Sequence, residues 1–242
     1  MIICLSFVNG RERKINVWLI GDSTCANKEI RAYPETGWGM PFTWFFDSTV
    51  SVRNKAVNGR STKSFIAENK WQQVLDSLQP GDYVFIQFGH NDEGKEKTGR
   101  YTTPDEFAAN LNRYILESRS KNAYPVLLTP VARRTFDSIT GQLKESHPIY
   151  ADRVRQVASD NKVPLIDLDA KSMAVIAKLG VTGSTMLFNH LQPGEHPNYP
   201  DGKTDNTHFN ELGARLMAEQ VLAGIRTLKL PLQERIVNHQ KQ

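Results

Sequence analysis

The chain has 242 residues, of which 39% are hydrophobic and 23% are charged, so it is long enough to bury the core of one α/β domain. Its 30 basic and 26 acidic residues are interspersed and give a formal net charge of +4. This slight excess favours anionic partners but argues against nucleic acid, because no Lys/Arg cluster, zinc spacing or recognition motif accompanies it. No run approaches the ~18 apolar residues of a membrane span, and we expect none.

The expected domain boundaries follow from the first and last apolar segments. Residues 1–14 are interpreted as an N-terminal extension or the remnant of a leader, because they begin with a short apolar run that lacks the parts of a complete signal peptide. Residues 15–230 are expected to form a single domain, and residues 231–242 a C-terminal tail. Cys4 and Cys25 can pair or remain as thiols, and their spacing leaves both options open.

Apolar strands alternate with helices along the chain. Strands are predicted at residues 15–20, 51–57, 83–88, 125–131 and 163–168, and helices at 37–47, 71–78, from about 103, at 146–161 and from about 210. Such alternation indicates a mainly parallel sheet covered by helices. We therefore predict a flavodoxin-like three-layer α/β/α sandwich with a mainly parallel five-stranded sheet. Residues 182–206 are rich in Gly and Pro and are expected to form a long functional loop.

Three of the predicted strands end in polar turns that contain glycine. The first strand leads into residues 21–24 (GDST), the second into residues 58–61 (NGRS) and the third into residues 89–92 (GHND). In a parallel α/β sheet, ligands bind at the carboxyl ends of the strands, so Ser23 stands where a nucleophile can act. The same residue types are ordinary turn formers, and the first turn alone leaves both readings open.

A base and an orienting acid for Ser23 occur near the other end of the chain, in residues 205–208 (DNTH). On a tight turn this spacing lets the carboxylate of Asp205 reach Nδ1 of His208 while Nε2 faces outward. Such a set lets the serine attack an acyl carbon, with the histidine as general base and then acid and the aspartate fixing its tautomer. The G-x-S-x-G pattern of α/β-hydrolases is missing around Ser23.

The oxyanion that forms in such an attack needs hydrogen-bond donors that are already aimed at it, each worth about 2.7–4 kcal/mol. Two of the polar turns offer such donors in addition to the N–H of Ser23. Gly59 has no side chain to block its backbone N–H, and Asn91 carries an amide NH₂ that does not titrate. The three donors together predict an oxyanion hole.

The set of motifs resembles the SGNH (GDSL-type) hydrolase family in order and spacing, across nearly the whole chain. Within that family it is similar to the rhamnogalacturonan acetylesterases, on the basis of GDST, of the histidine in GHND, and of residues 129–131 (TPV) followed by two arginines. The resemblance implies the SGNH hydrolase fold. It also gives Ser23, Gly59, Asn91 and His208 the four name-giving roles, with Asp205 completing the triad.

The resemblance implies a serine esterase that removes O-acetyl groups from a plant cell-wall polysaccharide, rhamnogalacturonan first of all, without metal or cofactor. Its partner is then an acetylated polysaccharide or oligosaccharide, and we expect a monomer in an extracellular or periplasmic location. Alternatives are an SGNH esterase for acetylxylan, a lipid or a thioester, and an inactive carbohydrate-binding protein of the same fold. A flavodoxin-like phosphate binder is disfavoured, because no glycine-rich or Lys-bearing phosphate cradle is present.

Several further side chains are candidates for binding substrate. Guanidinium groups suit bidentate recognition of galacturonate carboxylates, although Arg133 and Arg134 can equally be salt-bridged surface residues. His90 can line the acyl pocket or bond within its own loop, and His196 and Tyr199 can form a rim for sugar. A metal site is the alternative use of a nearby cluster, but it lacks the compact H-E-x-x-H spacing; its members are His190, Glu195, His196, Asp201, Asp205 and His208.

Overall fold

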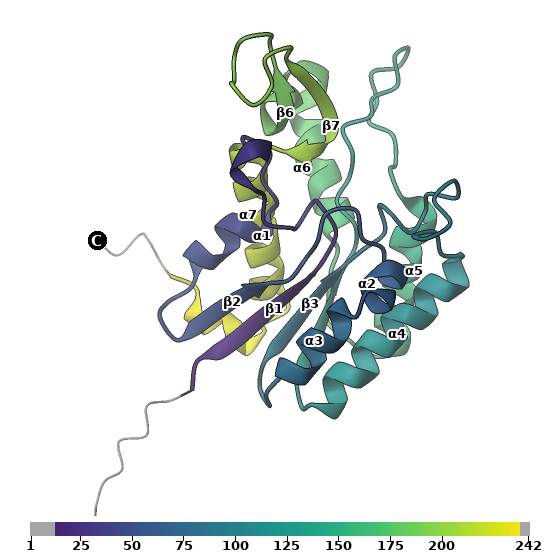
Figure 1. The fold of residues 1–242 in the computed structure, drawn as a ribbon, viewed down its shortest axis with the longest axis vertical. Helices are drawn as coiled ribbons and strands as arrows, with labels where there is room; N and C mark the ends of the chain where they lie inside the picture. Colours follow the sequence, from purple (N-terminus) through teal and green to yellow (C-terminus); the bar gives the residue numbers. More distant parts are fainter. Residues whose placement is uncertain (1–12, 238–242) are drawn as a thin grey trace, which may run out of the picture.

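Five parallel strands form the central sheet of the computed structural model, which describes residues 13–237 (Figure 1). The strand order is β2-β1-β3-β4-β5, with every neighbouring pair parallel. This is the flavodoxin-like order, and it confirms the predicted fold class. The strands are β1 (Ile15–Gly21), β2 (Val50–Asn54), β3 (Tyr83–Gln87), β4 (Tyr124–Leu128) and β5 (Leu165–Ile166).

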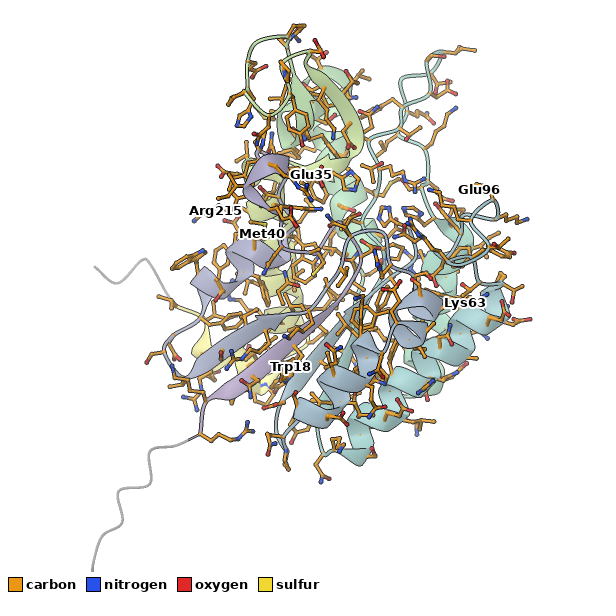
Figure 2. The ribbon with its side chains drawn as sticks, in the orientation of Figure 1. Trp18, Glu35, Met40, Lys63, Glu96 and Arg215 are labelled. Carbon is orange, nitrogen blue, oxygen red and sulfur yellow. The ribbon has the colours of Figure 1, made fainter. Side chains whose placement is uncertain are left out.

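Helices cover both faces of the sheet, because alternate residues of its strands are apolar on both sides. In β1, Val17 and Leu19 belong to one buried cluster while Trp18 and Ile20 belong to the other. Figure 2 shows Met40 and Arg215 on the side of α1 and α7, and Lys63 on the side of α2. The first face carries α1 (Gly39–Phe42), α6 (Leu168–Gly183) and α7 (Glu211–Thr227); the second carries α2 (Thr62–Ala67), α3 (Lys70–Ser77), α4 (Pro104–Ser120) and α5 (Pro148–Asp160).

Local sequence signals explain where the two longest helices begin. Thr103 caps α4 in a reciprocal capping box with Glu106, and Pro104 occupies the first turn, where its missing N–H is not needed. Asn210 caps α7 by accepting a hydrogen bond from the backbone N–H of Gly213 at 3.0 Å. Within residues 13–237, no helix combines the length and the apolar character that crossing a membrane requires.

The prediction of a long loop at 182–206 is wrong. This segment contains the end of α6, a 3₁₀ turn and most of an antiparallel hairpin of β6 (Phe188–Leu191) and β7 (Lys203–Phe209). The glycines and prolines that indicated a loop lie mainly between the two strands. β7 is mainly polar and partly exposed, and β6 has four residues of which two are polar, so neither strand has the apolar signature by which the sheet strands were recognised.

Two other segments also differ from the sequence prediction. The helix expected at 37–47 is split into the short α1 and a 3₁₀ turn, and Trp44 is 78% exposed rather than buried. Residues 231–237, expected as part of a tail, pack on the core: Leu232 is fully buried, and Asp47 N donates to Arg235 O at 2.9 Å. Cys25 is buried beside β1, whereas Cys4 lies outside the described residues. The 3₁₀ helices are Ile30–Ala32, Thr43–Phe45, Ser184–Leu187 and Pro231–Arg235.

Candidate active site

The turn that follows β1 is held rigidly by its own side chains. A Cβ on Gly21 would lie 2.6 Å from the carbonyl oxygen of Gln87, so only glycine allows β1 and β3 to approach this closely. Oδ1 of the fully buried Asp22 accepts from the N–H and the hydroxyl of Thr24 at 2.9 and 2.7 Å. The Thr24 hydroxyl in turn accepts from Nε2 of Gln87 at 2.9 Å. Ser23 therefore stands on a turn with little freedom to move.

Ser23, His208 and Asp205 form a continuous hydrogen-bonded chain. Oγ of Ser23 lies 2.9 Å from Nε2 of His208, although the two residues are 185 positions apart. Nδ1 of the same ring lies 2.9 Å from Oδ2 of Asp205. The structure thus brings together the three side chains that the sequence singled out, in the order that a serine nucleophile requires.

The surroundings of Asp205 stabilise its ionised form. Its Oδ1 accepts from the backbone N–H groups of Thr207 and His208 at 2.8 and 2.9 Å. Burial alone would raise the pKa of Asp205, but the hydrogen bonds and the charge of His208, with the two amides, hold that pKa well below its usual range. An ionised Asp205 accepts the N–H at Nδ1 of His208 and leaves Nε2 free to take a proton.

A bulge in β7 sets the geometry of this pair. The step from Phe188 to His190 on β6 opposes the longer step from Thr204 to Phe209 on β7. The extra residues of β7 form a bulge. Within it, the carboxylate of Asp205 forms a local turn by accepting from the backbone N–H groups of Thr207 and His208. The tight turn predicted from the DNTH spacing therefore exists, but it is embedded in a strand.

The predicted oxyanion donors lie on the two neighbouring turns. Gly59 has φ +72° in a turn closed by a 3.3 Å hydrogen bond from Arg60 N to Val57 O. One hydrogen of the Asn91 amide goes to the carbonyl of Arg60 at 3.1 Å, which orients the amide and leaves its second hydrogen available. In the described part of the chain, the N–H groups of Ser23 and Gly59 donate to no other group.

His90 and Arg133 belong to a partly buried polar cluster at the carboxyl ends of β3 and β4. Arg133 pairs with Oε1 of Glu93 at 3.1 Å, and Oε2 of the same carboxylate lies 2.9 Å from Nδ1 of His147. The ring of His90 packs edge-on against that of His147, with centroids 4.1 Å apart. Burial, followed by the charges of His147 and Arg133, holds the pKa of His90 well below its usual range, so this ring is neutral.

The remaining predicted substrate residues are bonded to the protein itself. Nε of Arg134 donates to Oγ of Ser184 and Nη1 to Oδ1 of Asn206, both at 3.0 Å. Arg134 thereby holds β7 close to the end of α6. Tyr199 donates to the carbonyl of Ala32 at 2.8 Å, and Nδ1 of His196 accepts from the backbone of the same hairpin turn. The structure therefore places these side chains as supports of the hairpin.

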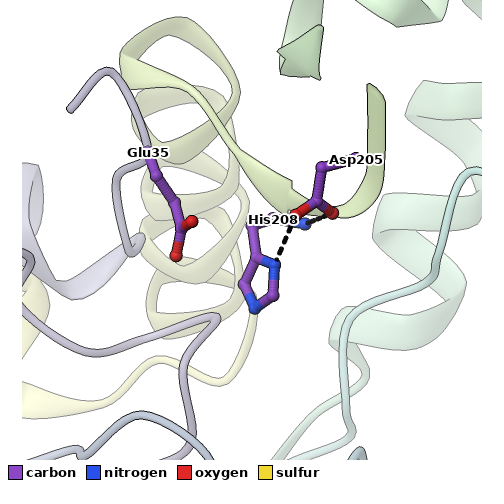
Figure 3. Close-up of side chains that lie close together, drawn as sticks. All are labelled: Glu35, Asp205 and His208. Atoms are coloured by element: carbon purple, nitrogen blue, oxygen red, sulfur yellow. Dashed lines mark hydrogen bonds and ion pairs between the residues drawn. The ribbon is translucent and has the colours of Figure 1, made fainter. Parts of the chain in front are cut away.

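Glu35 is a carboxylate at the site that no sequence motif marked. Its side chain and those of Asp205 and His208 hold potential ligand atoms within 4.8 Å of one another, and Figure 3 shows the two carboxylates flanking the imidazole. However, Nζ of the buried Lys28 lies 2.7 Å from Glu35 Oε1, and Nζ of Lys203 lies 3.8 Å from a carboxylate oxygen of each acid. These ammonium groups already neutralise the acids, which opposes binding of a divalent cation.

Known proteins are similar to this chain in sequence and in fold. The sequence model of the GDSL-like lipase/acylhydrolase family matches residues 19–216. Rhamnogalacturonan acetylesterase RhgT of Bacillus subtilis is 41% identical over 229 residues, which cover 95% of this chain and 97% of that protein. The probable rhamnogalacturonan acetylesterase YesY of the same bacterium is 36% identical and covers 92% of this chain and 97% of its own length.

Solved structures share the fold described above. The crystal structure of YxiM from Bacillus subtilis has a TM-score of 0.76 at 25% identity, over 90% of this chain and 58% of that chain. Axe2, an acetylxylan esterase from Geobacillus stearothermophilus, has a TM-score of 0.64 at 18% identity, over 88% of this chain and 94% of its own. The second likeness shows a common fold.

Proposed function

Because the chain belongs to the GDSL-like lipase/acylhydrolase family, we propose that it is a serine esterase that removes O-acetyl groups from rhamnogalacturonan. The observation that carries this proposal is the hydrogen-bonded chain from Ser23 through His208 to Asp205. Family membership agrees with the resemblance that the motifs predicted. The substrate is inferred from relatives that match almost the whole chain and are named rhamnogalacturonan acetylesterases.

In the first half of the proposed reaction, Oγ of Ser23 attacks the acetyl carbonyl carbon while Nε2 of His208 takes the hydroxyl proton. The negative charge that develops on the carbonyl oxygen is stabilised by the N–H groups of Ser23 and Gly59 and the amide of Asn91. His208 then gives its proton to the sugar oxygen as the ester bond breaks. Asp205 supports the imidazolium at this stage, because its carboxylate already accepts from Nδ1.

In the second half, a water molecule takes the place of the released sugar hydroxyl. His208 removes a proton from this water, which attacks the acetyl group on Ser23. The same oxyanion donors stabilise the second tetrahedral intermediate, and collapse of that intermediate returns the proton to Oγ and releases acetate. The proposed reaction steps use no metal or cofactor.

The surroundings of β7 suit a sugar polymer. A hollow of about 410 Å³ adjoins Asn206, the residue after the proposed triad acid, and its lining combines an aromatic ring with polar groups. Its lining includes Arg134, Thr135, Phe136, Asp137, Ser138 and Asn206. We therefore take an acetylated polysaccharide or oligosaccharide as the partner and place the enzyme outside the cytoplasm, where such polymers occur. All triad and oxyanion groups come from one chain, so we propose that a monomer is active.

The test is acetate release from acetylated rhamnogalacturonan, acetylxylan and p-nitrophenyl acetate by wild type and Ser23→Ala. We expect release from rhamnogalacturonan that Ser23→Ala abolishes and that a chelator leaves unchanged. Ser120→Ala is the matched control, because it removes an exposed hydroxyl at the end of α4. A wild type that is inert on every ester would overturn the catalytic proposal, and activity on xylan alone would overturn the substrate.

A further inference from the structure

A single arginine, Arg100, lies against the proposed oxyanion glycine. The atoms Nη1, Cζ and Nη2 of Arg100 lie 3.1, 3.3 and 3.4 Å from the point that a Cβ on Gly59 would occupy. These nearly equal distances mean that the flat face of the guanidinium is turned toward the side of Gly59 on which a Cβ would stand. Its N–H groups, which lie in the plane of the guanidinium, therefore point past Gly59 and not at it.

Arg100 differs from the other basic side chains that border the site. Arg60 pairs with Glu68 at 2.9 Å and Arg133 with Glu93 at 3.1 Å, and both lysines of the site are bound to Glu35. Arg134 is occupied by neutral groups of the protein. Within residues 13–237, the guanidinium of Arg100 forms no ion pair and donates no hydrogen bond, although its side chain is partly buried.

The segment that carries Arg100 is anchored at both ends. The buried carboxyl of Asp92 accepts from the hydroxyl of Thr102 at 3.1 Å, and Thr102 N donates to Asp92 O at 3.0 Å. Lys63 of α2 donates to the carbonyls of Thr98 and Tyr101 at 3.5 Å, and Figure 2 shows Lys63 and Glu96 of this segment on the same side of the molecule. These contacts hold the arginine beside the glycine before any ligand arrives.

We propose that Arg100 is a specificity-determining residue that binds the carboxylate of a uronic acid in the substrate. This inference rests on the proposed function, because rhamnogalacturonan carries a galacturonate carboxylate in every repeat of its backbone. A carboxylate held in the plane of the guanidinium makes two parallel charge-assisted hydrogen bonds. Since the guanidinium lies beside Gly59, a carboxylate bound to it places the acetylated ring beside the oxyanion donors. Arg100 belongs to no sequence motif, and the sequence did not single it out.

The test measures kcat/KM for acetate release by wild type, Arg100→Gln and Lys97→Gln. The substrates are an acetylated rhamnogalacturonan oligosaccharide, the same oligosaccharide with its carboxylates methyl-esterified, and p-nitrophenyl acetate. Lys97→Gln is the matched control, because it removes one positive charge from an exposed position of the same segment. Thermal unfolding of each variant establishes that it is folded.

We expect Arg100→Gln to lower kcat/KM about 10- to 100-fold on the free-carboxylate oligosaccharide, mainly through KM, since it removes hydrogen bonds to a charged group. On the methyl ester and on p-nitrophenyl acetate it should stay within about twofold of wild type, and Lys97→Gln should match wild type on all three substrates. An unchanged value on the free-carboxylate substrate, or an equal loss on p-nitrophenyl acetate, would overturn the proposal. A wild type that cleaves p-nitrophenyl acetate but neither oligosaccharide would instead refute the proposed function, and this inference with it.

Discussion

The buried carboxyl of Asp92 contributes a term to the stability of this protein that falls as the pH rises. Asp92 is fully buried and has no cationic partner among residues 13–237. Burial raises its pKa from 3.8 to about 7, although hydrogen bonds from Thr62 and Thr102 act in the opposite direction. At a pH between these two pKa values, Asp92 is protonated in the folded protein and ionised in the unfolded chain. The contribution of Asp92 to the free energy of unfolding therefore decreases with pH across that window, since this group binds fewer protons in the unfolded state.

The size of the effect follows from the two pKa values. A difference from 3.8 to about 7 corresponds to about 4 kcal/mol at 1.36 kcal/mol per pKa unit. The penalty is absent below about pH 4, where both states are protonated, and complete above about pH 7, where both are ionised. Between pH 5 and pH 8, about 2–3 kcal/mol of the free energy of unfolding should be lost.

Asp92→Asn isolates this contribution, because asparagine is the neutral isostere of the protonated acid and keeps an oxygen for Thr62 and Thr102. We would measure urea unfolding of wild type and variant at several pH values and follow the difference between them, in which all other titrating groups cancel. The free energy of unfolding of the variant, relative to that of wild type, should rise by about 2–3 kcal/mol from pH 5 to pH 8. If the free energy of unfolding of the variant instead fell relative to that of wild type as the pH rises, the reasoning would be refuted.

Three further substitutions test the geometry described above. Asp205→Asn should lower kcat about 10³–10⁴-fold at nearly unchanged KM, because the amide no longer fixes the tautomer of His208; steady-state kinetics on p-nitrophenyl acetate measure this. Lys28→Met should lower the free energy of unfolding by about 3 kcal/mol, since it leaves the buried Glu35 without its 2.7 Å partner; urea denaturation measures the loss. Gly213→Ala should cost about 1–3 kcal/mol in the same assay, because its Cβ would lie 2.0 Å from a carbonyl oxygen.

The two substitutions that test stability, Lys28→Met and Gly213→Ala, each have a control in the same molecule. Lys95→Met removes an exposed lysine and should change stability by less than about 0.5 kcal/mol. Gly183→Ala adds a Cβ at an ordinary 3.6 Å from its nearest neighbour and should be nearly neutral. If Asp205→Asn kept wild-type kcat, or if either stability variant behaved like its control, the corresponding contact would not have the role assigned to it.

The sheet and the polar turns at its edge could be predicted because each depends on signals local in sequence. The apolar runs of β1 and β3 predicted buried strands, and both strands are buried. The GDST turn is fixed by Gly21, which lies against the carbonyl of Gln87, and by the carboxylate of Asp22, which accepts from the N–H of Thr24. The pairing of Asp205 with His208 could also be predicted from the sequence, because the two residues lie within one turn.

The parts that could not be predicted depend on contacts between distant segments. The polar hairpin of β6 and β7 has neither the apolar alternation of a half-buried strand nor a short turn. Glu35 reaches the triad only because the segment after β1 folds back onto β7, and Arg100 meets Gly59 across two loops. Such placements are set by tertiary structure, and neither residue belongs to a motif.

The central claim is that Ser23 carries the acetyl group during turnover. Rapid quenching of the reaction with p-nitrophenyl acetate, followed by intact-mass and peptide mass spectrometry, measures this directly. The account predicts one added acetyl group on the peptide that contains Ser23, increased in Asp205→Asn if deacylation is slowed more than acylation, and absent from Ser23→Ala. An enzyme that turns over the ester without any acetylated intermediate, or with the acetyl group on another residue, would contradict it.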